Sequence, residues 1–291
     1  MVDKNSWGQW GSEDEAGALN FVTPEKVKKS VGLVETGQII SLAQVFGLNA
    51  AVAPHRKSPS RFMDRDAGDY ALGARAPGGF KFAEDTVQFA THSGTHVDAL
   101  SHAWSGDQLY NGHSDSHTRS TKGAQKCGAE KLRPIITRGI LVDLVEFLGK
   151  PLAASFQISP KHLEEYYAAH NISSQSGDAV LIRTGWGEQG LDPNVYHENE
   201  PGLNLEAARW LVKNQIAIVG ADNYAIETQP SSPETKFPVH LFLLHQNGVP
   251  LIENLVLSKI AEHKRKIFLF VMSPLLLAGS TASPVTPLAV L

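Results

Sequence analysis

The chain has 291 residues, of which 42% are hydrophobic and 19% are charged, a composition typical of a globular protein in water. Its formal net charge of −4 and the lack of a basic stripe with interleaved aromatic residues argue against a nucleic-acid partner. The single cysteine, Cys127, excludes an internal disulfide, and neither a signal peptide nor an apolar run of membrane-spanning length is found, so we expect a cytoplasmic protein with no membrane partner.

In the first half of the chain the predicted elements are few. A Thr-Pro-Glu sequence is typical of an N-cap followed by proline at the first helical position, and it predicts a helix over 23–32. A strand is expected at 39–45 and another at 86–90. Between them, 53–84 is rich in Pro, Gly, Arg and Asp without periodicity, and so long a connection predicts a lid or binding loop.

In the second half, strands and helices alternate. We predict strands at 140–145, 179–184, 216–220, 249–252 and 267–272, and helices at 159–170, 204–213 and 257–264. This alternation predicts an α/β fold with a mixed sheet. No repeat or linker interrupts the chain, so we expect a single domain over 1–291 with an N-terminal arm of about 35 residues.

The most informative segment is His92-Ser-Gly-Thr-His96-Val-Asp98-Ala-Leu-Ser-His102. Imidazoles and a carboxylate are the ligand types that hold Zn²⁺ or Mn²⁺. A strand would separate the outer histidines by roughly 33 Å, and a helix would turn Asp98 away from the first two histidines. The chain must therefore turn, and Gly94 can take the positive φ that a sharp turn needs. We expect Asp98 and His102 to begin a short helix, with His92, His96 and Asp98 as metal ligands and His102 as a proton-transfer group.

Three features elsewhere add to this site. His240 is followed thirteen residues later by Glu253, and a hairpin-like path through the intervening turn would return the carboxylate to the imidazole. This pair could hold a second cation or bind substrate, or it could be a capped turn with an edge carboxylate. Trp104 is a pocket candidate because it follows His102 closely. Asp222 and Glu227 follow a predicted strand, and loops beyond strand ends in α/β proteins often face the ligand, but we prefer to interpret Asp222 as the cap of a turn.

The eleven-residue segment resembles the HxGTHxDxxxH signature of the cyclase family, which includes bacterial kynurenine formamidases and isatin hydrolases. Further segments that fit the family are found at 10–26, 181–186, 220–222, 239–254 and 283–289. Two features depart from the compact formamidases: Ala99-Leu100-Ser101 lacks the proline before the last histidine, and the chain is longer. The resemblance is therefore to a longer-chain branch of related hydrolases.

The resemblance implies a swivelling β/β/α fold, assembled as a homodimer or homotetramer. It implies that His92, His96 and Asp98 are the primary metal ligands and that His102 transfers protons. His240 and Glu253 match the pair that completes a second metal position in the formamidases, whereas isatin hydrolase-like members bind a single Mn²⁺. The expected cofactor is thus one Mn²⁺ or Zn²⁺ ion, with a second ion where that pair binds metal.

These features predict an enzyme that acts on a small molecule, using metal-activated water to hydrolyse an amide, lactam or related acyl bond, as an arylformamidase or isatin hydrolase does. A lactone hydrolase would need the same site. A non-haem Fe(II) oxygenase is a further alternative, because His92, His96 and Asp98 could form its facial triad. A purely structural metal site is the third alternative, although such sites often use thiolates and no cysteine is near the motif.

Overall fold

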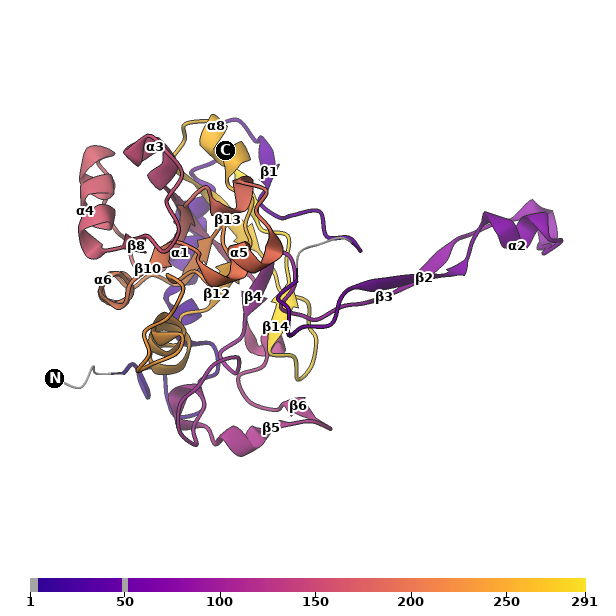
Figure 1. Cartoon of the computed structure of the whole chain (residues 1–291), viewed down its shortest axis with the longest axis horizontal. Coiled ribbons are helices and arrows are strands. Elements are labelled where there is room, and N and C mark those ends of the chain that lie inside the picture. Colours follow the sequence, from indigo (N-terminus) through magenta and orange to yellow (C-terminus); the bar gives the residue numbers. More distant parts are fainter. Residues whose placement is uncertain (1–4, 49–51) are drawn as a thin grey trace.

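The computed structural model describes residues 5–48 and 52–291, and its centre is a mixed nine-stranded sheet (Figure 1). In spatial order the strands are β1 (Ile39–Ser41), β15 (Leu288–Val290), β13 (Ile267–Met272), β7 (Ile135–Asp143), β9 (Ala179–Arg183), β11 (Ile218–Ala221), β12 (Leu251–Glu253), β4 (His96–Asp98) and β14 (Ala282–Pro284). The four neighbours from β7 to β12 are parallel, and the outer pairings on both sides are antiparallel. The predicted α/β class with a mixed central sheet is confirmed.

Three two-stranded sheets and a set of helices complete the fold. The small sheets pair β2 (Ser60–Arg65) with β3 (Glu84–Gln88), β5 (Thr118–Arg119) with β6 (Gly123–Ala124), and β8 (Gln157–Ile158) with β10 (Gly202–Leu203). The helices are α1 (Pro24–Val31), α2 (Ala67–Ala71), α3 (Leu144–Leu148), α4 (Pro160–Ala169), α5 (Pro193–Glu198), α6 (Leu205–Lys213), α7 (Pro238–His240) and α8 (Ser258–Glu262), with a π-helical segment η7 (Leu241–Gln246). Short 3₁₀ turns are η1 (Gly17–Phe21), η2 (Pro77–Gly79), η3 (Tyr110–Gly112), η4 (Asp115–His117), η5 (Ala129–Lys131) and η6 (Trp186–Glu188).

The helix starts follow the expected capping chemistry. The Thr23 hydroxyl accepts a hydrogen bond from the Lys26 N–H at the start of α1, and the Asn204 side chain accepts from the Ala207 N–H at the start of α6. Both interactions satisfy backbone donors that have no partner within the helix. Among the described residues, no helix is both long and apolar enough to cross a membrane.

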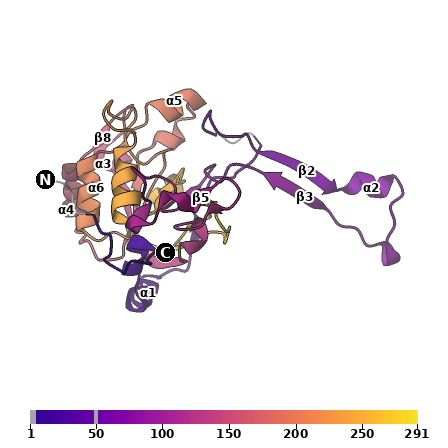
Figure 2. The same cartoon turned by 90° about the horizontal axis from the view of Figure 1, so that it is seen from below.

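Residues 53–84, predicted as a lid or binding loop, instead contain most of a hairpin that protrudes from the body; this hairpin, β2–α2–β3, is called the arm below. β2 and β3 form an antiparallel hairpin that carries α2 at its outer end, and both views show it extending away from the body (Figures 1 and 2). A capping box between Asp66 and Asp69 starts α2, and the Tyr70 hydroxyl bonds to the backbone of Phe82. The strand predicted at 86–90 is found two residues earlier. No strand was predicted at β2 because its sequence does not alternate between hydrophobic and polar residues, and both faces of this strand are largely exposed.

The helix predicted after Asp98 is wrong. Residues 96–98 form β4, which pairs with β12 on one side and β14 on the other, and the chain then continues through turns. The backbone groups of β4 are therefore used by two neighbouring strands and are not available for helical hydrogen bonds. Its position between them places the motif inside the sheet.

A buried charge cluster joins α1 to the sheet. Asp178 is fully buried just before β9, and its carboxylate binds Lys26 Nζ at 2.5 Å and the Arg138 guanidinium at 2.9 and 2.5 Å. It also accepts the Gln175 N–H. Burial lowers the pKa of Lys26, and Asp178 opposes this effect.

Candidate metal centre

The register between β4 and β12 brings His96, Asp98 and Glu253 together. His96 lies directly opposite Glu253 across this antiparallel pair, and Asp98 lies two residues further along β4. Residues two apart on a strand point to the same face, so His96 and Asp98 share a face with Glu253. His96 Nε2 is 3.2 Å from Glu253 Oε2 and 3.5 Å from Asp98 Oδ1.

The turn before β4 supplies the third side chain. Gly94 has φ +60°, as the sequence predicted, and an added Cβ would lie 2.6 Å from the Phe46 ring. This turn places His92 Nδ1 2.7 Å from Asp98 Oδ1 and His92 Nε2 3.0 Å from the Thr281 hydroxyl. The three predicted ligands thus converge at one point despite their spacing in the sequence.

The second carboxylate oxygen of Asp98 faces another pair of imidazoles, those of His102 and His240. Asp98 Oδ2 is 3.9 Å from His102 Nε2 and 3.8 Å from His240 Nε2. His240 Nε2 is also 3.3 Å from Glu253 Oε1. Asp98 and Glu253 therefore each face both groups, an arrangement that could hold either one cation or two.

The predicted hairpin between His240 and Glu253 is wrong. His240 ends α7 and continues directly into the π-helical segment η7, after which the chain enters β12. The pair nevertheless meets, with His240 Nε2 3.3 Å from Glu253 Oε1. The apolar run Leu241–Leu244 is helical because it packs into the core rather than against a second strand.

Glu227 orients His240. Its carboxylate lies 2.6 Å from His240 Nδ1 and also accepts the backbone N–H groups of Val239 and His240. The carboxylate can only accept, so Nδ1 carries the proton and Nε2 is left with a lone pair that faces Asp98. Such a carboxylate behind an imidazole is common at metal sites, where it fixes the tautomer and raises the basicity of the ligand.

His96 is oriented in the same way by its own chain. Its Nδ1 is 2.9 Å from the Gly94 carbonyl, which accepts the hydrogen bond and leaves Nε2 directed at the carboxylates. Burial would lower the pKa of His96, but Asp98 and Glu253 outweigh it and raise that pKa to about 10. The two carboxylates thus favour a bound cation at this position.

The acidic side chains are held in their charged form. Burial would raise the pKa of Asp98, but the imidazoles of His102 and His92 hold it well below its usual value. The pKa of Glu253 is also lowered, since His240 and His96 outweigh the effects of burial and of Asp98. Burial lowers the pKa of His102 to about 3.

The donor set fits a metal ion. His92 Nδ1, His96 Nε2 and both Asp98 oxygens are buried, and none makes a well-aligned hydrogen bond within residues 5–48 and 52–291, although His92 Nδ1 lies only 2.7 Å from Asp98 Oδ1. Buried polar atoms are almost always hydrogen-bonded, so four such atoms side by side indicate a place for a further group such as a cation. His92, His96 and Asp98 offer atoms within 4.8 Å of one another, as do Asp98, His102 and His240. Nitrogen and oxygen donors without sulfur suit Zn²⁺ and Mn²⁺ alike.

The cluster opens into a cavity of about 560 Å³. His102, His240 and Glu253 line it on the metal side. The remaining lining residues are Ala53, Pro54, His55, Arg56, Ala103, His197, Glu198, Tyr224, Ala225 and Phe237. Trp104 is 37% exposed and is not among these described lining residues.

Sequence reasoning missed several residues of this site. Glu227 gave a weak signal, because it follows β11 in the polar segment Asp-Asn-Tyr-Ala-Ile-Glu. Arg56 gave none, because it lies in the segment before the arm, far from the motif in sequence. Asp222 is placed as expected: it accepts hydrogen bonds from the Thr184 N–H and hydroxyl and from the Gly185 N–H, and so fixes the turn after β9.

The family whose profile is described as "Putative cyclase" matches residues 23–228. The chain belongs to the cyclase family. A solved structure described as a novel cyclase is 34% identical, with a TM-score of 0.92 over 99% of this chain and 98% of the other. Isatin hydrolase A from Labrenzia aggregata, bound to benzyl benzoate, is 19% identical, with a TM-score of 0.64 over 89% and 94% of the two chains.

Another solved structure, described as a predicted metal-dependent hydrolase from Bacillus stearothermophilus, is 21% identical, with a TM-score of 0.55 over 87% and 97% of the two chains. Among curated proteins none matches the chain. These two more distant structures show that the chain shares its fold with an isatin hydrolase and with a predicted metal-dependent hydrolase.

Proposed function

We propose that this cyclase-family protein is a metal-dependent hydrolase that cleaves an amide, lactam or related acyl bond of a small molecule, in the manner of an arylformamidase or isatin hydrolase. The observation that carries the proposal is the cluster of buried nitrogen and oxygen atoms of His92, His96 and Asp98, which make no well-aligned hydrogen bonds and lie next to the His102, His240 and Glu253 side chains that line the cavity. The likeness to an isatin hydrolase supports the choice of a C–N bond. His92, His96 and Asp98 would hold one Mn²⁺ or Zn²⁺ ion.

A bound ion of this kind supplies a water of lowered pKa and a Lewis acid for the scissile carbonyl. The residues supply the remaining chemistry. Asp98 and Glu253 provide the negative charge that anchors the cation, and Glu227 keeps His240 in the tautomer that faces the cluster. His102 lies at the cavity wall, where its imidazole can take a proton from water and return it to the leaving nitrogen.

His102 and His240 could also hold a second ion together with Asp98 and Glu253. Asp98 Oδ2 lies 3.9 Å from His102 Nε2 and 3.8 Å from His240 Nε2, which leaves room for an ion between them. In this arrangement His102 would be a metal ligand and not a proton-transfer group. Counting the bound ions separates the two arrangements.

The first experiment is to purify the protein without added metal, measure bound Mn and Zn per chain, and assay hydrolysis of N-formylkynurenine and isatin. Metal near one or two ions per chain with turnover of either substrate would support the proposal. Metal without turnover would retain the site and direct the search to other lactams, imides and lactones. Absence of both metal and activity after Mn²⁺ or Zn²⁺ is added would refute it. Oxygen consumption under Fe(II) would favour an oxygenase.

A His102→Ala variant is expected to keep one ion per chain and to lose about 10²- to 10⁴-fold in kcat, the usual contribution of a proton-transfer group. Metal content and turnover are measured on the same preparation, with His113→Ala as a matched control on a partly exposed histidine outside the cavity. A drop from two ions to one would make His102 a ligand. A kcat close to the wild-type value would contradict both roles.

A further inference from the structure

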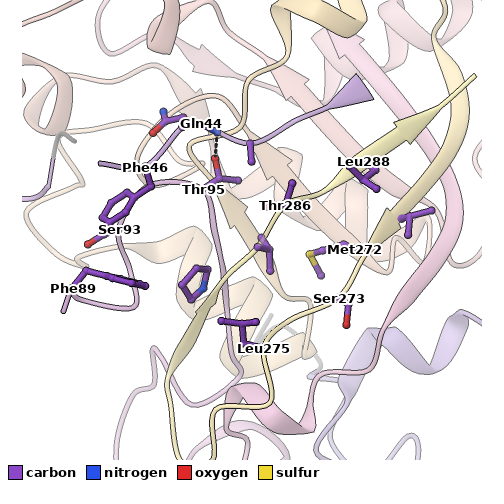
Figure 3. Close-up of a pocket in the computed structure, with 14 residues that line it drawn as sticks. Gln44, Phe46, Phe89, Ser93, Thr95, Met272, Ser273, Leu275, Thr286 and Leu288 are labelled. Atoms are coloured by element: carbon purple, nitrogen blue, oxygen red, sulfur yellow. Dashed lines mark hydrogen bonds between the residues drawn. The ribbon is translucent and has the colours of Figure 1, made fainter. Parts of the chain in front are cut away.

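Arg56 is the one lysine or arginine among the described residues that line the metal-side cavity. It lies at the base of the arm, in the segment that leads into β2. Two carboxylates, those of Glu198 and Glu253, also line this cavity. A separate cavity of about 520 Å³, walled in part by Phe46, Phe89, Met272 and Leu275, has no lysine or arginine among its described lining residues (Figure 3). The contacts of Arg56 show how its charge is held at the metal-side cavity.

Two contacts fix the guanidinium. Arg56 Nη1 donates a hydrogen bond to the backbone carbonyl of His92, and the Arg56 Cζ atom lies 5.4 Å from the centroid of the Tyr224 ring. No further hydrogen bond joins this guanidinium to the described part of the chain, so most of its five N–H donors remain available. A planar guanidinium held on one edge and one face can offer its remaining donors to a carboxylate.

The neighbouring walls of the cavity are aromatic. The rings of Tyr224 and Phe237 line it, and the Phe237 ring packs edge-on against His240 at 5.3 Å between centroids. Flat apolar walls with one fixed cation suit a planar molecule that carries an anionic group.

We propose that Arg56 binds a carboxylate on the substrate, and that the substrate class is therefore planar aryl amides or lactams bearing an acidic group. The reaction assigned to this substrate class rests on the proposed function, whereas the binding of a carboxylate by Arg56 does not. Arg56 would hold the carboxylate while the acyl carbonyl faces the metal ligands. It is a specificity-determining residue that offsets the negative charge of the neighbouring acidic side chains.

The test compares two substrates that differ by one carboxylate, N-formylanthranilate and formanilide. Arg56→Met is expected to raise KM for N-formylanthranilate about 10- to 100-fold, the range for a lost hydrogen bond to a charged group, while KM for formanilide changes less than about twofold. Lys57→Met removes the same charge from the exposed neighbouring residue and should change neither KM. Arg56→Lys should recover part of the loss for N-formylanthranilate.

A binding measurement separates this inference from the reaction. Benzoate binding to the metal-loaded protein is measured by calorimetry, with metal content determined for every variant because Arg56 touches the backbone of His92. Weaker binding to Arg56→Met at unchanged metal content would support the inference even if neither anilide is hydrolysed. Equal benzoate affinity in wild type and Arg56→Met, or an equal rise in KM for both anilides, would overturn it.

Discussion

An Asp98→Asn variant is expected to lose more than about 100-fold in metal affinity and to lose hydrolysis with it. Removing a residue that only hydrogen-bonds a metal ligand costs up to about 100-fold, and loss of a ligand itself should cost more. Asp98 faces both groups of imidazoles, and it is the residue shared by the two possible ligand sets found among the described residues. Asparagine keeps the shape but removes the negative charge, and its amide N–H₂ group cannot bind a cation. Metal content after dialysis and titration with Mn²⁺ and Zn²⁺ measure the loss.

Asp222→Asn is the matched control for this variant. Asp222 is equally buried, but it lies in the turn after β11 and binds Thr184 and Gly185 rather than the cluster. Burial raises its pKa to about 6, so an uncharged amide is less costly there than at Asp98. Metal affinity should be unchanged in Asp222→Asn. Wild-type affinity in Asp98→Asn as well would show that the cluster does not depend on Asp98.

Much of the metal centre could be predicted because its first part is local in sequence. His92, His96 and Asp98 lie within seven residues, and the need for a turn at Gly94 follows from the reach of the chain. The structure supplies what short-range reasoning could not, namely that 96–98 is a strand between two others. Three residues are too few to show a period in the sequence, so the helical i,i+4 spacing of Asp98 and His102 was misleading.

The second part of the site depends on sheet order. Glu253 reaches His96 because β12 pairs with β4, although 157 residues separate the two side chains and no local pattern encodes the pairing. The helical path after His240 was missed because a short apolar run fits a strand or a buried helix equally well. Arg56 was missed for a related reason, since it acts through a contact with a segment distant in sequence, and the sequence named Glu227 without indicating its contact with His240.

The arm shows a different limit of sequence reasoning. Alternation predicts a strand only where one face is buried and the other is exposed, and β2 and β3 are exposed on nearly every residue. Composition therefore indicated a loop for most of this segment. A hairpin that projects from the body buries neither face, so its strands carry no alternation of hydrophobic and polar residues that the sequence could reveal.

Asp178→Ala is expected to lower the free energy of unfolding by about 3–5 kcal/mol, the cost of leaving a buried cation without its partner. Asp178 is the only carboxylate that contacts both Lys26 and Arg138 among the described residues, and all three are buried. Without it, burial would lower the pKa of Lys26 further, because the opposing interaction would be lost. Urea unfolding at fixed metal concentration measures the change, since a bound ion stabilises the folded state of every variant.

Glu146→Ala is the control for this second variant. Glu146 pairs with Lys266, but the carboxylate is largely exposed, and a pair of this kind contributes only about 0–1 kcal/mol. The contrast between the two alanine variants therefore measures burial rather than charge alone. A loss below about 1 kcal/mol in Asp178→Ala would mean that the cost of taking three charged groups out of water already cancels their attraction. In that case the other contacts between α1 and β7, and not the ion cluster, would hold α1 on the sheet.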